Sequence, residues 1–224
     1  MSSEYKLIDI SSWPRRTTFE FFSDYEDPFF NITGNVDVTE LRQFCKQNEL
    51  SYSLAALFIS QKAVNAIPEF RQRLLDGKII EYASVDSTQT TLNDDETFSF
   101  CYFENRSDIF EFDAAGRAAR EKYLKLKTFD VETDRIDLIY YSVIPWISFT
   151  SFKHASRSNN LQTVPRIVFG KVYSDGAREK MPISVEVHHA LVDGIHVGRY
   201  FEFYQRAVDE LSKTNAANLQ HAKI

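Results

Sequence analysis

The chain has few cysteines and fewer basic than acidic residues, and each of these shortages excludes a class of function. Its two cysteines, Cys45 and Cys101, stand far apart and in no paired spacing. The sequence therefore supports neither a disulfide framework nor a cysteine zinc site. There are 26 basic and 32 acidic residues, giving a formal net charge of −6, and no Lys/Arg cluster is present. This balance argues against nucleic acid, and against an anionic membrane surface, as the main partner.

The sequence also lacks internal linkers and long apolar runs. No Pro/Gly/Ser-rich stretch or charge block divides it, so we expect one domain over residues 1–224. No run approaches the roughly 18 apolar residues that a membrane span needs. The first residues, MSSEYKLIDISSW, contain no basic segment followed by an apolar one, so we expect a cytoplasmic protein. Core-forming residues are abundant, since 43% of the chain is hydrophobic and Phe occurs 19 times, which predicts a compact fold.

Helical and β patterns alternate without a strict strand–helix–strand rhythm. Apolar spacing predicts helices up to about residue 22 and over 38–48, 53–66, 107–127 and from 197 onward, with a helical turn over 70–75. Alternating or continuous apolar runs predict strands over 5–10, 30–36, 78–82, 89–92, 98–103, 137–144, 147–152, 166–173 and 180–187. The aromatic run 98–103 indicates a strand buried on both faces. This mixture predicts an α+β fold, a two-layer mixed sheet packed by helices.

The stretch 187–199, VHHALVDGIHVGR, contains three of the five histidines. It follows a predicted strand and precedes a predicted helix, and such corners often present side chains to a pocket. Strand alternation places His189 on the apolar face of Val185 and Val187. His188 falls on the opposite face. A histidine on an apolar face loses hydration, which lowers its pKa and keeps it neutral at pH 7, as a general base requires.

Three interpretations of this stretch are open from the residues alone. In the first, His188 and His196 are structural and Asp193 caps the last helix. In the second, His188 or His189 binds a metal ion together with Asp193 and His196. The divergence of adjacent strand residues and the absence of a Glu-containing helical zinc motif weaken this alternative. In the third, His189 is the general base of an acyl transfer, and Asp193 with the flexible Gly194 sets the geometry of the corner.

Several segments resemble a known family. HHALVDG at 188–194 resembles the His-His-x-x-x-Asp-Gly motif of thioester-dependent acyltransferases. DISSWPRRTTFEFF at 9–22, NAIPEFRQRLLDGKIIEYASVD at 65–86, ETFSF at 96–100 and IPWISFTSF at 144–152 resemble segments of the chloramphenicol acetyltransferases. The resemblance extends over nearly the whole chain and implies that family's CoA-dependent acyltransferase fold.

The resemblance also implies roles for individual residues. His189 would take the proton of an acceptor hydroxyl as that hydroxyl attacks acetyl-CoA, the co-substrate, and no metal would be needed. Asp193 would be structural and paired with Arg15. Ser151 matches the hydroxyl that donates to the tetrahedral oxyanion. The family is a trimer in which the histidine of one subunit faces an acceptor pocket built largely by its neighbour, so a homotrimer with interface active sites is implied.

The expected acceptor pocket departs from the family pattern. Residues expected to bind the substrate are Phe21, Phe22, Tyr25, Glu26, Phe103, Asn159 and Val168. Val168 stands where the family usually has a threonine that helps to bind a water. Residues 24–28 and 154–159 are polar where the family is apolar or aromatic.

A charged loop opposes burial of an apolar nitroaryl group. We therefore expect an acetyl-CoA-dependent O-acetyltransferase with chloramphenicol, and hence antibiotic resistance, among its candidate roles. The alternative is an inactive family member that binds a small molecule.

Overall fold

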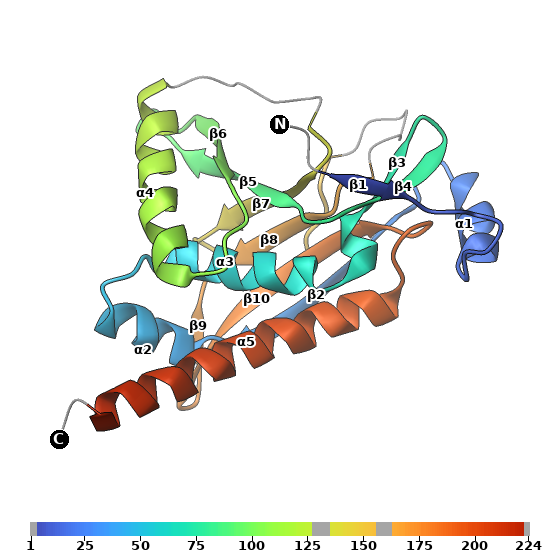
Figure 1. The fold of residues 1–224 in the computed structure, drawn as a ribbon. Helices are drawn as coiled ribbons and strands as arrows, with labels where there is room; N and C mark the ends of the chain where they lie inside the picture. The colour runs from blue at the N-terminus through green and yellow to red at the C-terminus, as the bar shows by residue number, and fades with distance from the viewer. Residues whose placement is uncertain (1–3, 127–134, 156–162, 222–224) are drawn as a thin grey trace.

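A seven-stranded mixed sheet lies at the centre of the protein. The computed structural model describes residues 4–126, 135–155 and 163–221 (Figure 1). The sheet order is β2 (Phe29–Asp37), β10 (Arg178–His188), β8 (Arg166–Gly170), β7 (Leu138–Ile144), β5 (Asp86–Leu92) and β6 (Phe98–Phe103), and β9 (Tyr173–Asp175) pairs with β10. The β5–β7 and β7–β8 pairs are parallel and the other pairs are antiparallel. The predicted mixed sheet is confirmed.

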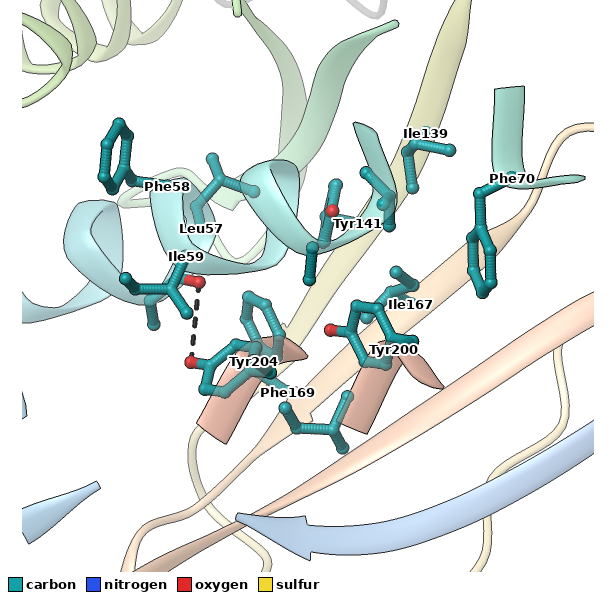
Figure 2. Packing of buried hydrophobic residues seen from close by; sticks show 14 of the residues in the cluster. Leu57, Phe58, Ile59, Phe70, Ile139, Tyr141, Ile167, Phe169, Tyr200 and Tyr204 are labelled. Atoms are coloured by element: carbon teal, nitrogen blue, oxygen red, sulfur yellow. Dashed lines mark hydrogen bonds between the residues drawn. The ribbon is translucent and has the colours of Figure 1, made fainter. Parts of the chain in front are cut away.

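Helices cover one face of this sheet and one of its ends. These are α2 (Thr39–Gln47), α3 (Tyr52–Asn65), α4 (Ile109–Leu126) and α5 (Gly194–His221). Figure 2 shows Tyr200 and Tyr204 of α5 close to Leu57 of α3, beside Ile167 and Phe169 of β8. All five side chains are buried, and this layer of helices on sheet confirms the α+β prediction. In the described residues no helix is both long and apolar enough to cross a bilayer.

The opposite face of the sheet, which we call the far face, is formed by the alternate strand residues. Because Ile167 and Phe169 point toward the helices, Arg166, Val168 and Gly170 point away from them. On β10, Glu186 pairs with Arg166 and shares the far face. Arg166 and Glu186 of the far face belong to the charge cluster near the candidate site.

A second, three-stranded sheet corrects the prediction of a helical turn over 70–75. It consists of β1 (Tyr5–Leu7), β4 (Lys78–Tyr82) and β3 (Gln72–Leu75). Only Pro68–Arg71 forms a helical turn, η1, and β3 then joins β4 through Asp76 and Gly77, both at positive φ. A four-residue strand is too short to show its period, and pairing with β4 decides its conformation.

Two further strand predictions need correction. Residues 147–152 form no strand, because β7 ends at Ile144 before Pro145, and Trp146 and Ile147 are exposed. Proline cannot donate to a sheet ladder, so pairing stops there. Strand β6 is correctly placed but lies at a sheet edge, with Phe98 exposed and Cys101 buried. It therefore has one covered face rather than two.

Candidate functional site

The histidine corner is built at the end of β10, where the strand gives way to α5. The ladder ends at His188, a turn follows, and α5 begins at Gly194. Strand alternation therefore stops one residue before His189, and the prediction that His189 lies on the face of Val185 and Val187 does not hold. Gly194 was expected to permit an unusual backbone turn. No such turn is needed, because Gly194 is not among the glycines at positive φ in the described chain.

The Arg15–Asp193 ion pair that the resemblance implies is present in the structure. Arg15 lies directly before α1 (Arg16–Ser23), and its Nη1 contacts Oδ2 of Asp193. Its Nη2 donates to Oδ1 of Asp193 at 3.2 Å and to the carbonyls of His189 at 3.3 Å and Ala190 at 3.5 Å. Burial lowers the pKa of Arg15. One guanidinium thus connects α1 to both sides of the corner, and its planar fork suits this arrangement.

The His189 imidazole is held between an aromatic ring and a carboxylate. It stacks on Phe22 with centroids 3.9 Å apart and an interplanar angle of 8°, and Phe30 lies 4.5 Å from it. Its backbone N–H donates to the carbonyl of Pro28 at 2.8 Å. The buried Nδ1 lies 3.3 Å from Oδ1 of Asp193 without hydrogen-bond alignment. In the described chain no protein group bonds Nε2, and 32% of the side chain is exposed.

The other two histidines of the stretch make contacts inside the corner. His188 is buried against Phe29, and burial lowers its pKa to about 4, with the charge of His189 adding to the effect. Its Nδ1 accepts from the N–H of Ala190 at 3.3 Å. The strongly desolvated ring is therefore His188, where strand alternation had indicated His189.

His196 is tied to the start of α5. Its Nδ1 accepts from the N–H of Asp193 at 2.9 Å, its Nε2 lies 3.4 Å from Glu69, and burial lowers its pKa. In the described ranges no three His, Cys, Asp or Glu side chains converge to hold a metal ion. The proposed ligands His188 and His196 use a ring nitrogen for a backbone bond instead.

Three of the expected substrate-binding residues lie beside His189. Phe21, Phe22 and Tyr25 form a cluster with centroids 5.0–5.5 Å apart, and Phe22 is the ring on which His189 stacks. Phe21 and Tyr25 are 60% and 49% exposed. Glu26 is exposed in the same loop. The result is an open aromatic surface next to the partly exposed imidazole.

The structure does not gather the remaining predicted residues around His189 within one chain. Ser151 is exposed in the segment after β7 and shares no hydrogen bond with His189 in the described residues. Val168 is buried on the far face. Phe103 is buried against Phe112 between β6 and α4, four strands from β10 and hence roughly 19 Å away. Asn159 lies outside the described residues.

One group of charges near the corner was not predicted. Arg166 donates from Nη1 to Oε1 of Glu186 at 2.7 Å, and its guanidinium lies 4.7 Å from the Phe29 ring centroid. The backbone N–H of His154 donates to Oε2 of Glu186 at 3.2 Å. A charge inside an otherwise apolar strand requires a partner when buried. The sequence contains a signal for this cluster, because Arg166 and Glu186 each stand alone in an apolar run.

A hollow lies at the end of β10 opposite to the histidine corner. It has a volume of about 290 Å³ and mostly apolar walls, and two cations, Arg42 and Lys171, belong to its lining; the other lining residues are Tyr52, Ser53, Ala56, Val143, Pro145, Phe169, Gly170, Val172 and Met181. Met181 and His188 are seven residues apart on β10, so the hollow is roughly 23 Å from the corner of the same chain.

The sheet with its helical layer and the His-His-x-x-x-Asp-Gly corner define the CoA-dependent acyltransferase fold. A solved chloramphenicol acetyltransferase superposes with a TM-score of 0.83 at 26% identity, covering 91% of this chain and 99% of that one. A dihydrolipoamide acetyltransferase of Azotobacter vinelandii, 18% identical with a TM-score of 0.63 over 89% of this chain and 87% of its own, shares the fold.

The family follows from the sequence comparison. The family model for chloramphenicol acetyltransferase matches residues 3–205. A chloramphenicol acetyltransferase of Escherichia coli is 31% identical over 213 residues, covering 92% of this chain and 94% of the relative. One of Proteus mirabilis is 31% identical over 216 residues, covering 91% and 94%. The chain belongs to the chloramphenicol acetyltransferase family.

Proposed function

We propose that the protein is an acetyl-CoA-dependent O-acetyltransferase that uses His189 as its general base and accepts chloramphenicol or a more polar hydroxyl compound. The observation that carries the proposal is the His189 imidazole. Phe22 stacks on the ring and the carbonyl of Pro28 holds its backbone N–H, while Nε2 has no protein partner in the described residues. An oriented ring whose Nε2 is open to a bound hydroxyl is what proton abstraction requires.

The proposed reaction has two steps. Nε2 of His189 takes the hydroxyl proton as the acceptor oxygen bonds to the carbonyl carbon of the acetyl thioester. The negative charge passes to the carbonyl oxygen, where the hydroxyl of Ser151 donates to it. Collapse of the tetrahedral intermediate breaks the carbon–sulfur bond. The departing thiolate of coenzyme A recovers the proton from His189, and the acetyl ester is released.

We place acetyl-CoA in the hollow that Arg42 and Lys171 line. Cations there suit the phosphates of the coenzyme, and the apolar walls suit its extended arm. Because the hollow and His189 lie at opposite ends of β10, they meet most directly when they belong to different subunits. This supports a homotrimer with active sites at the subunit interfaces, arranged head to tail around a closed ring.

The test is release of free thiol from acetyl-CoA with chloramphenicol and a panel of polar hydroxyl compounds as acceptors. We expect acceptor-dependent thiol release with an equal amount of acetylated product, and a loss of about 10²- to 10⁴-fold in His189→Ala. His188→Gln is the matched control. The ring of His188 is next to His189 in the sequence, but it is buried and takes no part in the proposed reaction. Equal rates for the native protein and His189→Ala, with retained acceptor binding, would support an inactive binding protein instead.

A further inference from the structure

A buried carboxylate on β10 holds the segment that carries Ser151. The Glu186 side chain is 3% exposed and lies on the far face of the sheet. Although burial raises it, hydrogen bonds from His154 and Arg166 bring the pKa of Glu186 down to about 2. The carboxylate is therefore an anion that accepts both from the buried guanidinium of Arg166, at 2.7 Å, and from the backbone of residue 154, at 3.2 Å.

The segment 147–155 follows the β8–β10 pair along the far face. At its start, the carbonyl of Ile147 accepts from the N–H of Lys171 at 3.0 Å. Phe149 packs on Gly170 so closely that an added Cβ there would lie 2.9 Å from its ring. At its end, His154 contacts Glu186 through both its backbone N–H and its imidazole, whose Nδ1 is 3.6 Å from Oε1. The segment is thus fixed at both ends.

Ser151 lies between these two fixed points and is itself exposed. Its position therefore depends on the anchors on either side. We propose that Glu186 is a positioning residue that fixes the Ser151 hydroxyl where it donates to the oxyanion during acetyl transfer. The proposal rests on the acetyl-transfer function proposed above. A donor must lie within a few tenths of an ångström of its place in the transition state to be effective, which is why a distant anchor affects the rate.

The ion pair of Lys153, near the same end of the segment 147–155, is weaker because it is exposed to solvent. Lys153 Nζ lies 2.9 Å from Oδ2 of Asp27, but the two side chains are 69% and 41% exposed. Exposed ion pairs hold their partners loosely, whereas hydrogen bonds to a buried charge are stronger. We therefore assign the anchoring to Glu186, and expect Lys153→Ala to change kcat by less than about twofold.

The experiment compares Glu186→Gln with the native protein, and Glu186→Gln/Ser151→Ala with Ser151→Ala. We expect kcat to fall about 10- to 100-fold when Ser151 is present, with KM for acetyl-CoA unchanged within about twofold. Without the Ser151 hydroxyl the same change should cost less than about threefold. The control is Glu81→Gln, a carboxylate paired with Arg71 at 3.2 Å in the small sheet, for which we expect no change in kcat.

A second variant separates positioning from folding. Arg166→Met/Glu186→Leu removes the anchor without leaving a buried cation unpaired, so the chain should remain folded, and we expect the same dependence on Ser151. Native kcat in this variant, or an equal loss with and without Ser151, would overturn the proposal.

Hydrogen exchange tests the anchor independently of activity. Peptides covering 147–155 should exchange at least about tenfold faster in both Glu186 variants than in the native protein. Unchanged exchange overturns the proposal, even if the native protein transfers acetyl groups. Absence of acetyl transfer by the native protein would instead refute the proposed function.

Discussion

Arg15 and Asp193 are 178 residues apart in the sequence and form an ion pair that connects the start of α1 to the histidine corner. The same guanidinium also donates to the carbonyls of His189 and Ala190. The pair thus fixes the backbone from His189 to Asp193, which begins at the residue that carries the imidazole. Its two side chains are mostly buried, at 12% and 31% exposed, so loss of one partner leaves a poorly solvated charge behind.

We therefore expect Arg15→Ala and Asp193→Ala each to lower the free energy of unfolding by about 1–3 kcal/mol and to lower kcat. Arg15→Lys should not restore activity, because an ammonium cannot reach the carboxylate and both carbonyls together. Urea unfolding and kcat measure this, with Arg16→Ala as the control, since Arg16 pairs with Glu20 on the exposed side of α1. Additive losses in the Arg15→Ala/Asp193→Ala double variant would contradict a direct coupling.

Ser151 gives a prediction in which activity and stability separate. Its side chain is exposed, so Ser151→Ala removes little from the folded chain, and the free energy of unfolding should change by less than about 0.5 kcal/mol. Loss of an oxyanion donor should lower kcat about 10²- to 10³-fold. Thr150→Ala, one residue earlier and also exposed, should leave kcat unchanged. A native kcat in Ser151→Ala would remove the serine from the mechanism.

The histidine corner was largely predictable from the sequence, while its surroundings were not. The motif HHALVDG indicates the chemistry, and the family resemblance indicates Arg15 as the partner of Asp193. Strand alternation failed for His189 because it applies only where the ladder continues, and the ladder ends at His188. The stacking of His189 on Phe22 requires the path of α1 across the corner, which no local pattern contains.

The charge cluster of Glu186, Arg166 and His154 shows the same limit. The partner of a buried charge depends on strand register and on the route of a segment without regular structure. Arg166 meets Glu186 because β8 and β10 pair in this register, and the sequence indicates the strands without their alignment. The strand β3 was missed for a related reason, since its conformation depends on its pairing with β4.

His188 makes the stability of the protein depend on pH. Its pKa is about 4 in the folded chain and about 6.5 in the unfolded one. The unfolded chain therefore binds the proton first as pH falls, so this residue destabilises the fold progressively between pH 6.5 and 4 and has no such effect above that range. The full difference between the two pKa values corresponds to about 3 kcal/mol.

His188→Gln cannot take up this proton. We expect the native protein to lose about 3 kcal/mol more than the variant between pH 7 and pH 4, measured by urea unfolding at several pH values. Other titrating groups contribute equally to both proteins and cancel in the difference. Parallel stability curves would show that the His188 site does not disfavour the charged ring.

The proposed acetyl-CoA hollow predicts a change in KM. Lys171 is exposed and belongs to the lining of the hollow, so Lys171→Glu should raise KM for acetyl-CoA about tenfold or more, which corresponds to about 1.4 kcal/mol. Lys171 would bind the coenzyme equally in the ground state and in the transition state, so its loss should change kcat little. Lys78→Glu, an exposed lysine of the small sheet, is the control. An unchanged KM would place the coenzyme elsewhere.

A site shared between subunits can be tested by mixing two damaged chains. His189→Ala lacks the general base and Lys171→Glu binds acetyl-CoA weakly, but each retains the half of the site that the other lacks. In a head-to-tail trimer assembled at random from equal amounts, about one quarter of the sites combine the intact histidine with the intact hollow. Below the KM for acetyl-CoA of the Lys171→Glu protein, co-refolded chains should therefore reach about a quarter of native activity. If each site lay within one chain, the mixture would give only the average of the two separate proteins, because no exchange of subunits could restore a damaged site.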